Sequence, residues 1–155
     1  MPKLHSYKAT ITWTGNTGHG TQSYQCYERS HTISIHNKPD ILASSDPALM
    51  GDPSKHNPEE LLLASLSGCH MLWYLHLCSA NGITVVEYKD EASGTMQENE
   101  ATGGHFTEVI LRPDVTITDE AQIERANELH KEANRMCFIA NSCNFPVRHE
   151  PVCKV

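Results

Sequence analysis

The sequence predicts an α+β fold in a single domain that spans residues 1–155. Alternation of apolar and polar residues with a period of two predicts strands in three separate stretches of the chain. Two stretches with helical periodicity lie between them, which gives the order β-β-β-α-β-β-α-β. Because no repeated strand-helix-strand unit appears, the pattern favours segregated sheets and helices over a parallel α/β sheet.

The first strands are predicted near the N-terminus. In Tyr7–Trp13 the residues Ile11 and Trp13 fall on one face of a strand, and Thr21–His36 alternates again. We therefore expect a half-buried antiparallel meander here. Residues 45–56 hold two prolines and a glycine, so they are predicted to form a loop.

A strong helix start follows this loop. Asn57 can cap the helix, Pro58 suits its first position, and Glu60 completes a capping box. The helical pattern continues to Ala80, and Asn81-Gly82 ends it. The helix is apolar nearly all round, so we expect it to be buried in the middle of a domain or of an assembly.

The second half of the chain repeats the change from strands to a helix. Two long strand-like runs, Ile83–Met96 and His105–Ile117, are joined by a predicted turn at Gln97–Gly104. Thr118 is predicted to cap a second helix, and Phe145–Val155 is predicted to be the last strand. Residues at helical spacing mark the inner face of that helix: Ile123, Ala126, His130, Ala133 and Cys137.

Charge and hydropathy exclude several classes of function. The chain has 12 Lys and Arg against 19 Asp and Glu, which gives a net charge of −7 with histidine neutral. An acidic chain without a basic run is a poor candidate for binding nucleic acid or an anionic membrane. The longest apolar run, Leu61–Ala64, is far shorter than the roughly 20 residues that span a bilayer. Met1–Thr10 does not look like a secretory signal, so we expect a cytoplasmic protein.

Six cysteines and ten histidines leave thiol and metal chemistry open. In a reducing cytoplasm, thiols are more often buried residues, metal ligands or redox groups than disulfides. Cys69 lies about three turns into the first helix, after Ser67-Gly68, where small residues leave room for a solute to approach. It is either a buried structural thiol or a reactive one with a pKa lowered by a cation from elsewhere in the fold.

Cys137 lies where the second helix ends, on a segment that could move to meet another sulfur. One fixed and one movable thiol suit a peroxide-reducing pair, in which the first forms a sulfenic acid and the second condenses with it. A core thiol is the alternative for Cys137 as well. Cys143 could serve as an alternate resolving thiol, and three others are expected to be packing residues: Cys26, Cys78 and Cys153.

Metal binding has weaker support in the sequence. His70, His76 and Cys78 are close together, but the paired short spacings of a zinc site and the H-E-x-x-H motif are missing. There is also no G-x-S-x-G motif and no glycine-rich phosphate loop before a helix. We therefore predict neither a metal nor another cofactor.

One motif resembles a known family. Asn57-Pro58-Glu59-Glu60-Leu61, followed by Cys69, resembles the N-P-E-x-L-x-x-x-x-x-x-x-C signature of the OsmC/Ohr family, the osmotically inducible and organic hydroperoxide resistance proteins. The family's second cysteine follows at the end of the second long helix, which matches Cys137. The resemblance covers about residues 7–153. It implies an intertwined α+β homodimer with two long central helices and active sites at the dimer interface.

The resemblance also implies an activity, the thiol-dependent reduction of hydroperoxides in the response to oxidative stress. Cys69 would be the peroxidatic cysteine and Cys137 the resolving cysteine, and an external dithiol would recycle them. Glu59 matches a family glutamate that pairs with a thiolate-supporting arginine from the N-terminal strands. Arg29 is the arginine there, with His19 as a weaker substitute.

At two positions the sequence departs from the Ohr pattern and resembles the OsmC-like branch of the family. Cys137 is followed by Phe138 and not by Cys-Pro, and Cys69 is followed by His70 and not by Phe. Apolar residues beside the two cysteines are the expected lining of a hydroperoxide pocket: Met71, Leu72, Trp73 and Phe138. The alternative function is a non-enzymatic dimer that senses redox state or binds a small molecule.

Overall fold

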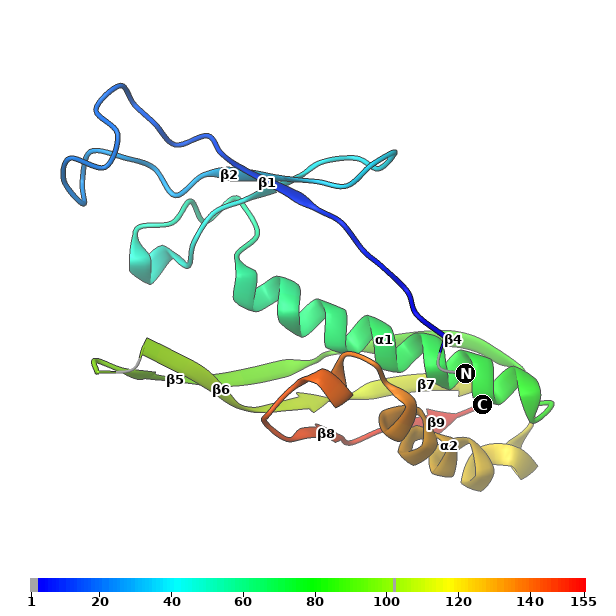
Figure 1. Cartoon of the computed structure of the whole chain (residues 1–155). Helices are drawn as coiled ribbons and strands as arrows, with labels where there is room; N and C mark the ends of the chain where they lie inside the picture. Colours follow the sequence, from blue (N-terminus) through cyan, green and yellow to red (C-terminus); the bar gives the residue numbers. More distant parts are fainter. Residues whose placement is uncertain (1–2, 102) are drawn as a thin grey trace. The chain divides into compact units, whose positions relative to one another are not determined.

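A computed structural model gives the structure of the chain and describes residues 3–101 and 103–155. The chain divides into two compact units, one that ends at Leu61 and one that runs from Leu62 to Val155. Figure 1 shows the helices and strands in chain order. The units are described in turn, and the mixed α+β class predicted from the sequence is confirmed.

The first unit contains an antiparallel meander, as predicted. Its strands are β1 Thr10–Trp13, β2 His31–Ser34 and β3 Ile41–Ala43, hydrogen-bonded in the order β1-β2-β3. Ile33 of β2 pairs with Ile11 on one side and with Ile41 on the other. Residues 45–56 form a loop with one short 3-10 turn, Pro47–Leu49, which agrees with the two prolines there.

Two expectations for this unit are wrong. Only the end of the predicted Thr21–His36 strand forms a paired strand. The residues before it form turns, which a single bridge between Asn16 and Tyr27 closes. The predicted inner face of β1 is also exposed, since the Ile11 side chain is 62% accessible. The physical reason is that β1 is an edge strand without a packed layer against it in the described part of this unit.

Helix α1, Pro58–Ala80, has the bounds that the capping pattern predicts. The Glu60 N–H donates to Asn57 Oδ1 at 2.8 Å, and the Asn57 N–H donates back to Glu60 Oε2 at 3.3 Å. At the other end Gly82 has a φ of +71°, and the Ile83 N–H donates to the Cys78 carbonyl at 2.9 Å. A left-handed glycine with this bond is a common way to end a helix.

The burial of α1 follows one stripe. The buried residues recur every four positions: Leu66, His70, Tyr74 and Cys78. Most of the remaining apolar surface is half-buried or exposed, and Leu72 is 64% accessible. By length and composition alone α1 could cross a membrane, a criterion that core helices of soluble proteins also meet. One buried stripe on an apolar helix leaves surface for an assembly to cover.

The second unit holds two three-stranded sheets, β4-β7-β9 and β5-β6-β8. In each sheet the last strand is parallel to its neighbour and the other pair is antiparallel. The strands are β4 Val85–Asp90, β5 Ser93–Asn99, β6 Gly103–Leu111, β7 Pro113–Ile117, β8 Val147–His149 and β9 Val152–Lys154.

Each long strand predicted in this unit is therefore split between the two sheets. Pro113 begins β7 and Pro151 separates β8 from β9, since proline has no N–H for a ladder. The Arg112 N–H donates to the Asp90 carboxylate at 2.6 Å, and both residues lie where the chain passes from one sheet to the other. The turn between β5 and β6 is shorter than the predicted Gln97–Gly104, because residues at both ends of that range already pair as strands. Thr102 lies outside the described residues.

Helix α2, Ile123–Met136, begins later than predicted. Asp119, and not Thr118, caps the turn that precedes it, because the Ala121 N–H donates to Asp119 Oδ1 at 3.0 Å. A 3-10 turn, Glu120–Gln122, then leads into the helix. The buried face of α2 matches the predicted spacing at three positions: Ala126, His130 and Ala133.

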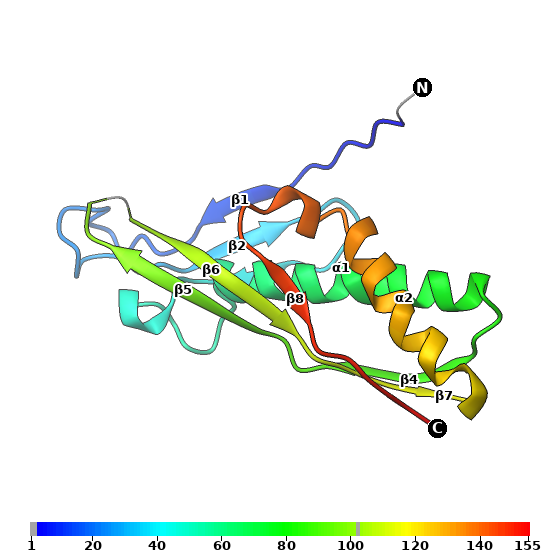
Figure 2. The ribbon, with the colours of Figure 1, turned by 90° about the horizontal axis from the view of Figure 1, so that it is seen from below.

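The main core of the second unit joins both helices to a sheet. Tyr74 of α1, Val115 and Ile117 of β7, and Leu129 of α2 belong to one buried cluster. Both views place α2 beside the C-terminal half of α1 (Figures 1 and 2). A second cluster joins Leu66 of α1 to β6. This packing fixes the face of α2 that α1 meets.

Candidate active site

The structure brings Cys69 and Cys137 together in the second unit. Cys69 is half-buried in the middle of α1, and Cys137 is 1% accessible at the C-terminal cap of α2. Cys69 lies close enough to Cys137 to raise the pKa of its thiol, and both thiols are free. Nearness of two thiols is a requirement for a disulfide to form without a large movement of the backbone.

The surroundings of Cys137 make it a weak acid. Burial is the main cause that raises the pKa of its thiol to about 11, and the neighbouring Cys69 thiol raises it further. Backbone N–H groups of Ile139 and Ala140 oppose this, and the Ala140 N–H lies 3.4 Å from the Cys137 sulfur. Cys137 is therefore held as a neutral thiol near neutral pH.

The segment after α2 is held by its own hydrogen bonds. The Asn141 N–H donates to the Cys137 carbonyl at 3.0 Å, and the Asn141 side-chain amide donates to the Arg135 carbonyl at 3.1 Å. A 3-10 turn, Ala140–Ser142, continues from there. The sequence predicts a movable Cys137. In the structure, hydrogen bonds hold the turn that follows it, and its thiol lies near Cys69.

Two of the four residues expected to line a substrate pocket meet beside the thiols. The ring of Trp73, one turn after Cys69, packs edge-on against the ring of Phe138 with centroids 5.4 Å apart. Phe138 is 66% accessible, so this aromatic surface is open in the single chain. Met71 is half-buried and Leu72 is exposed, and both turn away from Trp73 because successive helical residues point in different directions.

Glu59 lies in the first turn of α1, ten residues before Cys69 on the same helix. Its side chain is half-buried, and its Oε2 atom is buried without a hydrogen-bond partner among the described residues. A buried carboxylate oxygen without a donor is costly to leave unpaired. This oxygen therefore marks a place where a donor would be stabilising.

Arg29 makes different contacts from those the resemblance implies. Its guanidinium donates to the carbonyls of Tyr27 and Tyr24 at 2.5 and 2.8 Å and lies over both tyrosine rings. In the described part of the first unit, Arg29 forms no ion pair with Glu59. Arg29 instead lines a cavity of about 530 Å³, together with the exposed His19 and with Cys26.

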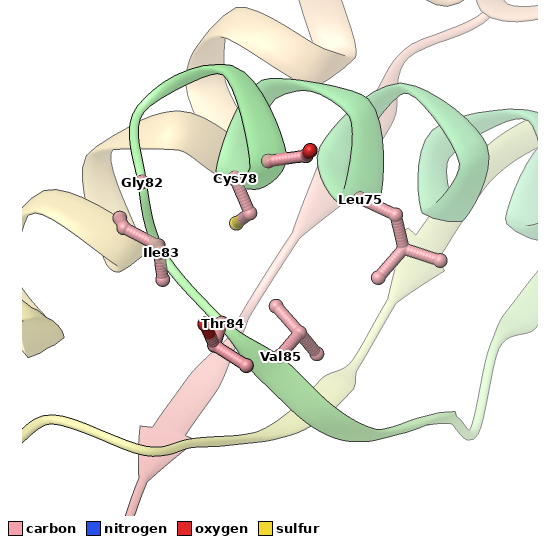
Figure 3. A pocket seen from close by; sticks show the side chains of 7 residues that line it. Leu75, Cys78, Gly82, Ile83, Thr84 and Val85 are labelled. Atoms are coloured by element: carbon pink, nitrogen blue, oxygen red, sulfur yellow. The ribbon is translucent and has the colours of Figure 1, made fainter.

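Three of the remaining thiols, Cys78, Cys143 and Cys153, are poorly placed for nucleophilic chemistry. Figure 3 shows Cys78 pointing into a cavity of about 350 Å³ between the end of α1 and the start of β4. Burial raises the pKa of Cys78, of Cys143 and of Cys153, which keeps each sulfur protonated. Among the described residues, no group of three or more His, Cys, Asp or Glu side chains is arranged to hold a metal ion.

Sequence reasoning missed a buried group of three imidazoles, which we name the histidine cluster: His70, His130 and His149. The Nε2 atom of His70 lies 3.0 Å from Nδ1 of His130, and the two rings are stacked. The sequence places His70 among the possible metal ligands and His130 at a periodic position of the second helix. The only signal in the sequence was polar residues on two buried helix faces, and it does not show that they meet.

Comparisons with known proteins agree with this fold and motif. A family model for OsmC-like proteins matches residues 51–151, more than half of the chain. An OsmC-like protein of unknown function from Vibrio cholerae is 31% identical, with a TM-score of 0.86 over 96% of this chain and 100% of that one. No curated protein matches the chain.

Two solved structures named as organic hydroperoxide resistance proteins share the fold at lower identity. The one from Elizabethkingia anophelis is 20% identical, with a TM-score of 0.72 over 99% of both chains. The one from Legionella pneumophila is 15% identical, with a TM-score of 0.68 over 99% of this chain and 100% of that one. The family model, the fold and the N-P-E…Cys motif all agree, and the chain therefore belongs to the OsmC-like protein family.

Proposed function

We propose that the protein is a thiol-dependent hydroperoxide reductase in which Cys69 is the peroxidatic and Cys137 the resolving cysteine. The observation that carries this proposal is that two free thiols are neighbours in the second unit. The names of two structural relatives, organic hydroperoxide resistance proteins, support the class of substrate. The nearer similarity to a protein of unknown function leaves the activity itself to be tested.

The proposed reaction has two steps. The Cys69 thiolate attacks one oxygen of the hydroperoxide, the O–O bond breaks, and the leaving alkoxide takes a proton to become an alcohol. The Cys137 sulfur then attacks the Cys69 sulfenic acid, the S–O bond breaks, and water leaves with the proton from Cys137. Two thiols lose two electrons and the peroxide gains them. An external dithiol then reduces the disulfide by exchange.

The difference in exposure supports this division of roles. Cys69 is half-buried on the side of α1 near Trp73, whereas Cys137 is 1% accessible. The raised pKa of Cys137 keeps it as a thiol, and the thiolate is the nucleophile that attacks a peroxide. The more accessible sulfur is therefore the one that a peroxide meets first. The aromatic surface of Trp73 and Phe138 suits the apolar part of an organic hydroperoxide.

We further propose that the protein works as a homodimer. Several large apolar side chains are exposed in the single chain: Ile11, Leu42, Leu72, Val86 and Phe138. Large apolar side chains that a single chain leaves exposed are found at interaction faces. Sedimentation at the 17.3 kDa of one chain would contradict this proposal.

In that assembly we propose that Glu59 accepts a guanidinium, with Arg29 as the first candidate. The unpartnered Glu59 Oε2 supports a missing donor at this position. A guanidinium held by a carboxylate stabilises a nearby thiolate. Arg29 would have to exchange its two carbonyl contacts for the carboxylate.

The test is oxidation of the reduced protein with one equivalent of cumene hydroperoxide, followed by peptide mapping without reductant. We expect a disulfide between Cys69 and Cys137, and a sulfenic acid trapped on Cys69 in the Cys137→Ser variant. Addition of a dithiol and more peroxide should then give repeated cycles. Stable oxidation without cycling would identify a redox sensor, and a disulfide that omits Cys69 would contradict the proposed roles.

A further inference from the structure

The histidine cluster is a buried polar group that the proposed reaction does not use. His70 of α1 and His130 of α2 are both fully buried, and His149 of β8 packs its ring against the His70 ring with centroids 5.7 Å apart. The ring of Tyr74 stacks on His130 with centroids 3.8 Å apart. The cluster therefore ties together three elements of the second unit at the point where α1 meets α2.

The cluster is expensive for stability. Three of its ring nitrogens are buried without a hydrogen-bond partner among the described residues, Nδ1 of His70, Nε2 of His130 and Nδ1 of His149. The hydroxyls of Tyr74 and Tyr88 beside them are in the same state. Each such atom costs free energy that an apolar side chain of similar size would not cost. Stability alone is therefore a poor explanation for three imidazoles at this place.

The position of the cluster relative to the thiols offers a better explanation. His70 directly follows Cys69 on α1, and His130 precedes Cys137 on the same face of α2, two helical turns away. The hydrogen bond between Nε2 of His70 and Nδ1 of His130 is the polar contact that joins the buried faces of the two helices. Because helices are stiff, this contact restricts how far Cys69 lies from Cys137.

We propose that His70 and His130 are positioning residues that hold Cys69 against Cys137 for the disulfide-forming step, and that acid releases this contact. The inference rests on the proposed pairing of the two thiols, but not on the identity of the oxidant. Neutral imidazoles can share one N–H between the two rings. When both are protonated, each ring nitrogen carries a hydrogen and the acceptor is lost.

Among the described residues, the groups that shift the three imidazoles include no carboxylate to compensate added positive charge. Tyr74 of α1 stacks on His130, and Lys131 of α2 acts on His149. Tyr74 itself is next to Tyr88 of β4, Cys78 and Cys153 of β9. None of these is a carboxylate, and Asp90 acts on Tyr88 but is not among the groups that shift the imidazoles.

The direction of the pH effect follows from these surroundings. Burial first, and then His149, lowers the pKa of His70 to about 4. Burial first, and then the other two imidazoles, lowers the pKa of His130 to about 3. A released cluster in water would bind protons below its usual pKa of 6.5, while the packed cluster does not. The packed cluster is therefore favoured above that pKa. Below it, the equilibrium constant for packing falls by up to about 100-fold per pH unit, because two imidazoles bind protons only in the released state.

The test compares disulfide formation in the full chain at neutral and acidic pH, with diamide as the oxidant. Diamide takes two electrons and two protons from a thiol pair, so the measurement does not require peroxidase activity. The key variant is His70→Gln combined with His130→Asn, since the two amides can replace the imidazole hydrogen bond but do not titrate. His130→Leu removes the bond, and His105→Gln, on the exposed part of β6, is the matched control.

We expect the amide pair to match the wild type within about threefold near pH 7 and to exceed it at least about tenfold near pH 5. Any loss of thiolate at low pH affects both proteins equally and cancels in this ratio. The His130→Leu variant should form the Cys69–Cys137 disulfide at least about tenfold more slowly near pH 7. Emission from Trp73 in a Trp13→Phe background checks that α1 and α2 still pack, and His105→Gln should follow the wild type.

The outcomes separate this inference from the proposed function. Equal pH dependence of the wild type and the amide pair would overturn the inference, as would wild-type rates in a folded His130→Leu variant. If His130→Leu does not fold, the comparison with the amide pair decides alone. A wild type that forms no Cys69–Cys137 disulfide near pH 7 would overturn the proposed function and this inference together.

Discussion

Cys69 and Cys137 form one thiol pair, but they differ in their access to solvent. A sulfur at the cap of α2 is packed by the turn that follows it, and this burial raises its pKa to about 11. A sulfur in the middle of α1, next to small residues, keeps a path to solvent. The chemistry of the pair is therefore ordered by packing, because the accessible thiol reacts with a solute before the buried one can.

Alkylation measures this difference between residues. Near neutral pH we expect iodoacetamide to modify Cys137 at least about tenfold more slowly than a cysteine in an unfolded peptide, because its thiolate fraction is small. The rate should rise as the pH approaches about 11. Peptide mapping over a time course gives the rates, and the urea-unfolded chain is the control. Modification of Cys137 at the unfolded rate in the native protein would contradict its burial.

At the residue scale, the sequence singled out the two thiols as candidates but not the histidine cluster. Cys69 is a candidate because its motif combines a helix cap, an acid and a cysteine in one stretch. The contact joins His70 and His130, which lie on different helices and are 60 positions apart in the chain. Periodicity describes each helix alone, so it does not predict which polar side chains meet across a helix pair.

Local signals predicted α1 better than any other element. Its two ends are set by neighbouring residues, the capping box at Asn57 and the left-handed Gly82. The strands were harder, because alternation does not distinguish a strand that continues from one that crosses to another sheet. Pro113 and Pro151 mark these crossings, and the burial of β1 was overestimated because edge strands and central strands share the same pattern.

The cap of α1 gives a prediction at the scale of the element. Asn57→Ala removes the acceptor of the Glu60 N–H and should lower the free energy of unfolding by about 1 kcal/mol. Asn57→Asp is the matched control, since it keeps the acceptor and adds a negative charge at the positive end of the helix dipole. Urea unfolding followed by circular dichroism measures both. An unchanged midpoint for Asn57→Ala would show that the capping box does not stabilise the helix.

At the scale of the whole molecule, the apolar surface and the unpartnered Glu59 point in the same direction. The single chain leaves Ile11, Leu72 and Phe138 exposed, and it leaves a buried carboxylate oxygen without a donor. Both features are costs that a partner surface could remove. The thiol pair, in contrast, lies wholly within the second unit. The account therefore assigns the disulfide step to one chain and the activation of Cys69 to the assembly.

The most direct test of the central claim is the rate of dithiol-dependent cumene hydroperoxide consumption in three proteins. The account predicts turnover in the wild type, no turnover above background in Cys69→Ser, and a single oxidation without recycling through an internal disulfide in Cys137→Ser. Cys26→Ser, in the first unit, is the matched control and should keep the wild-type rate. Wild-type turnover in Cys69→Ser would contradict the account.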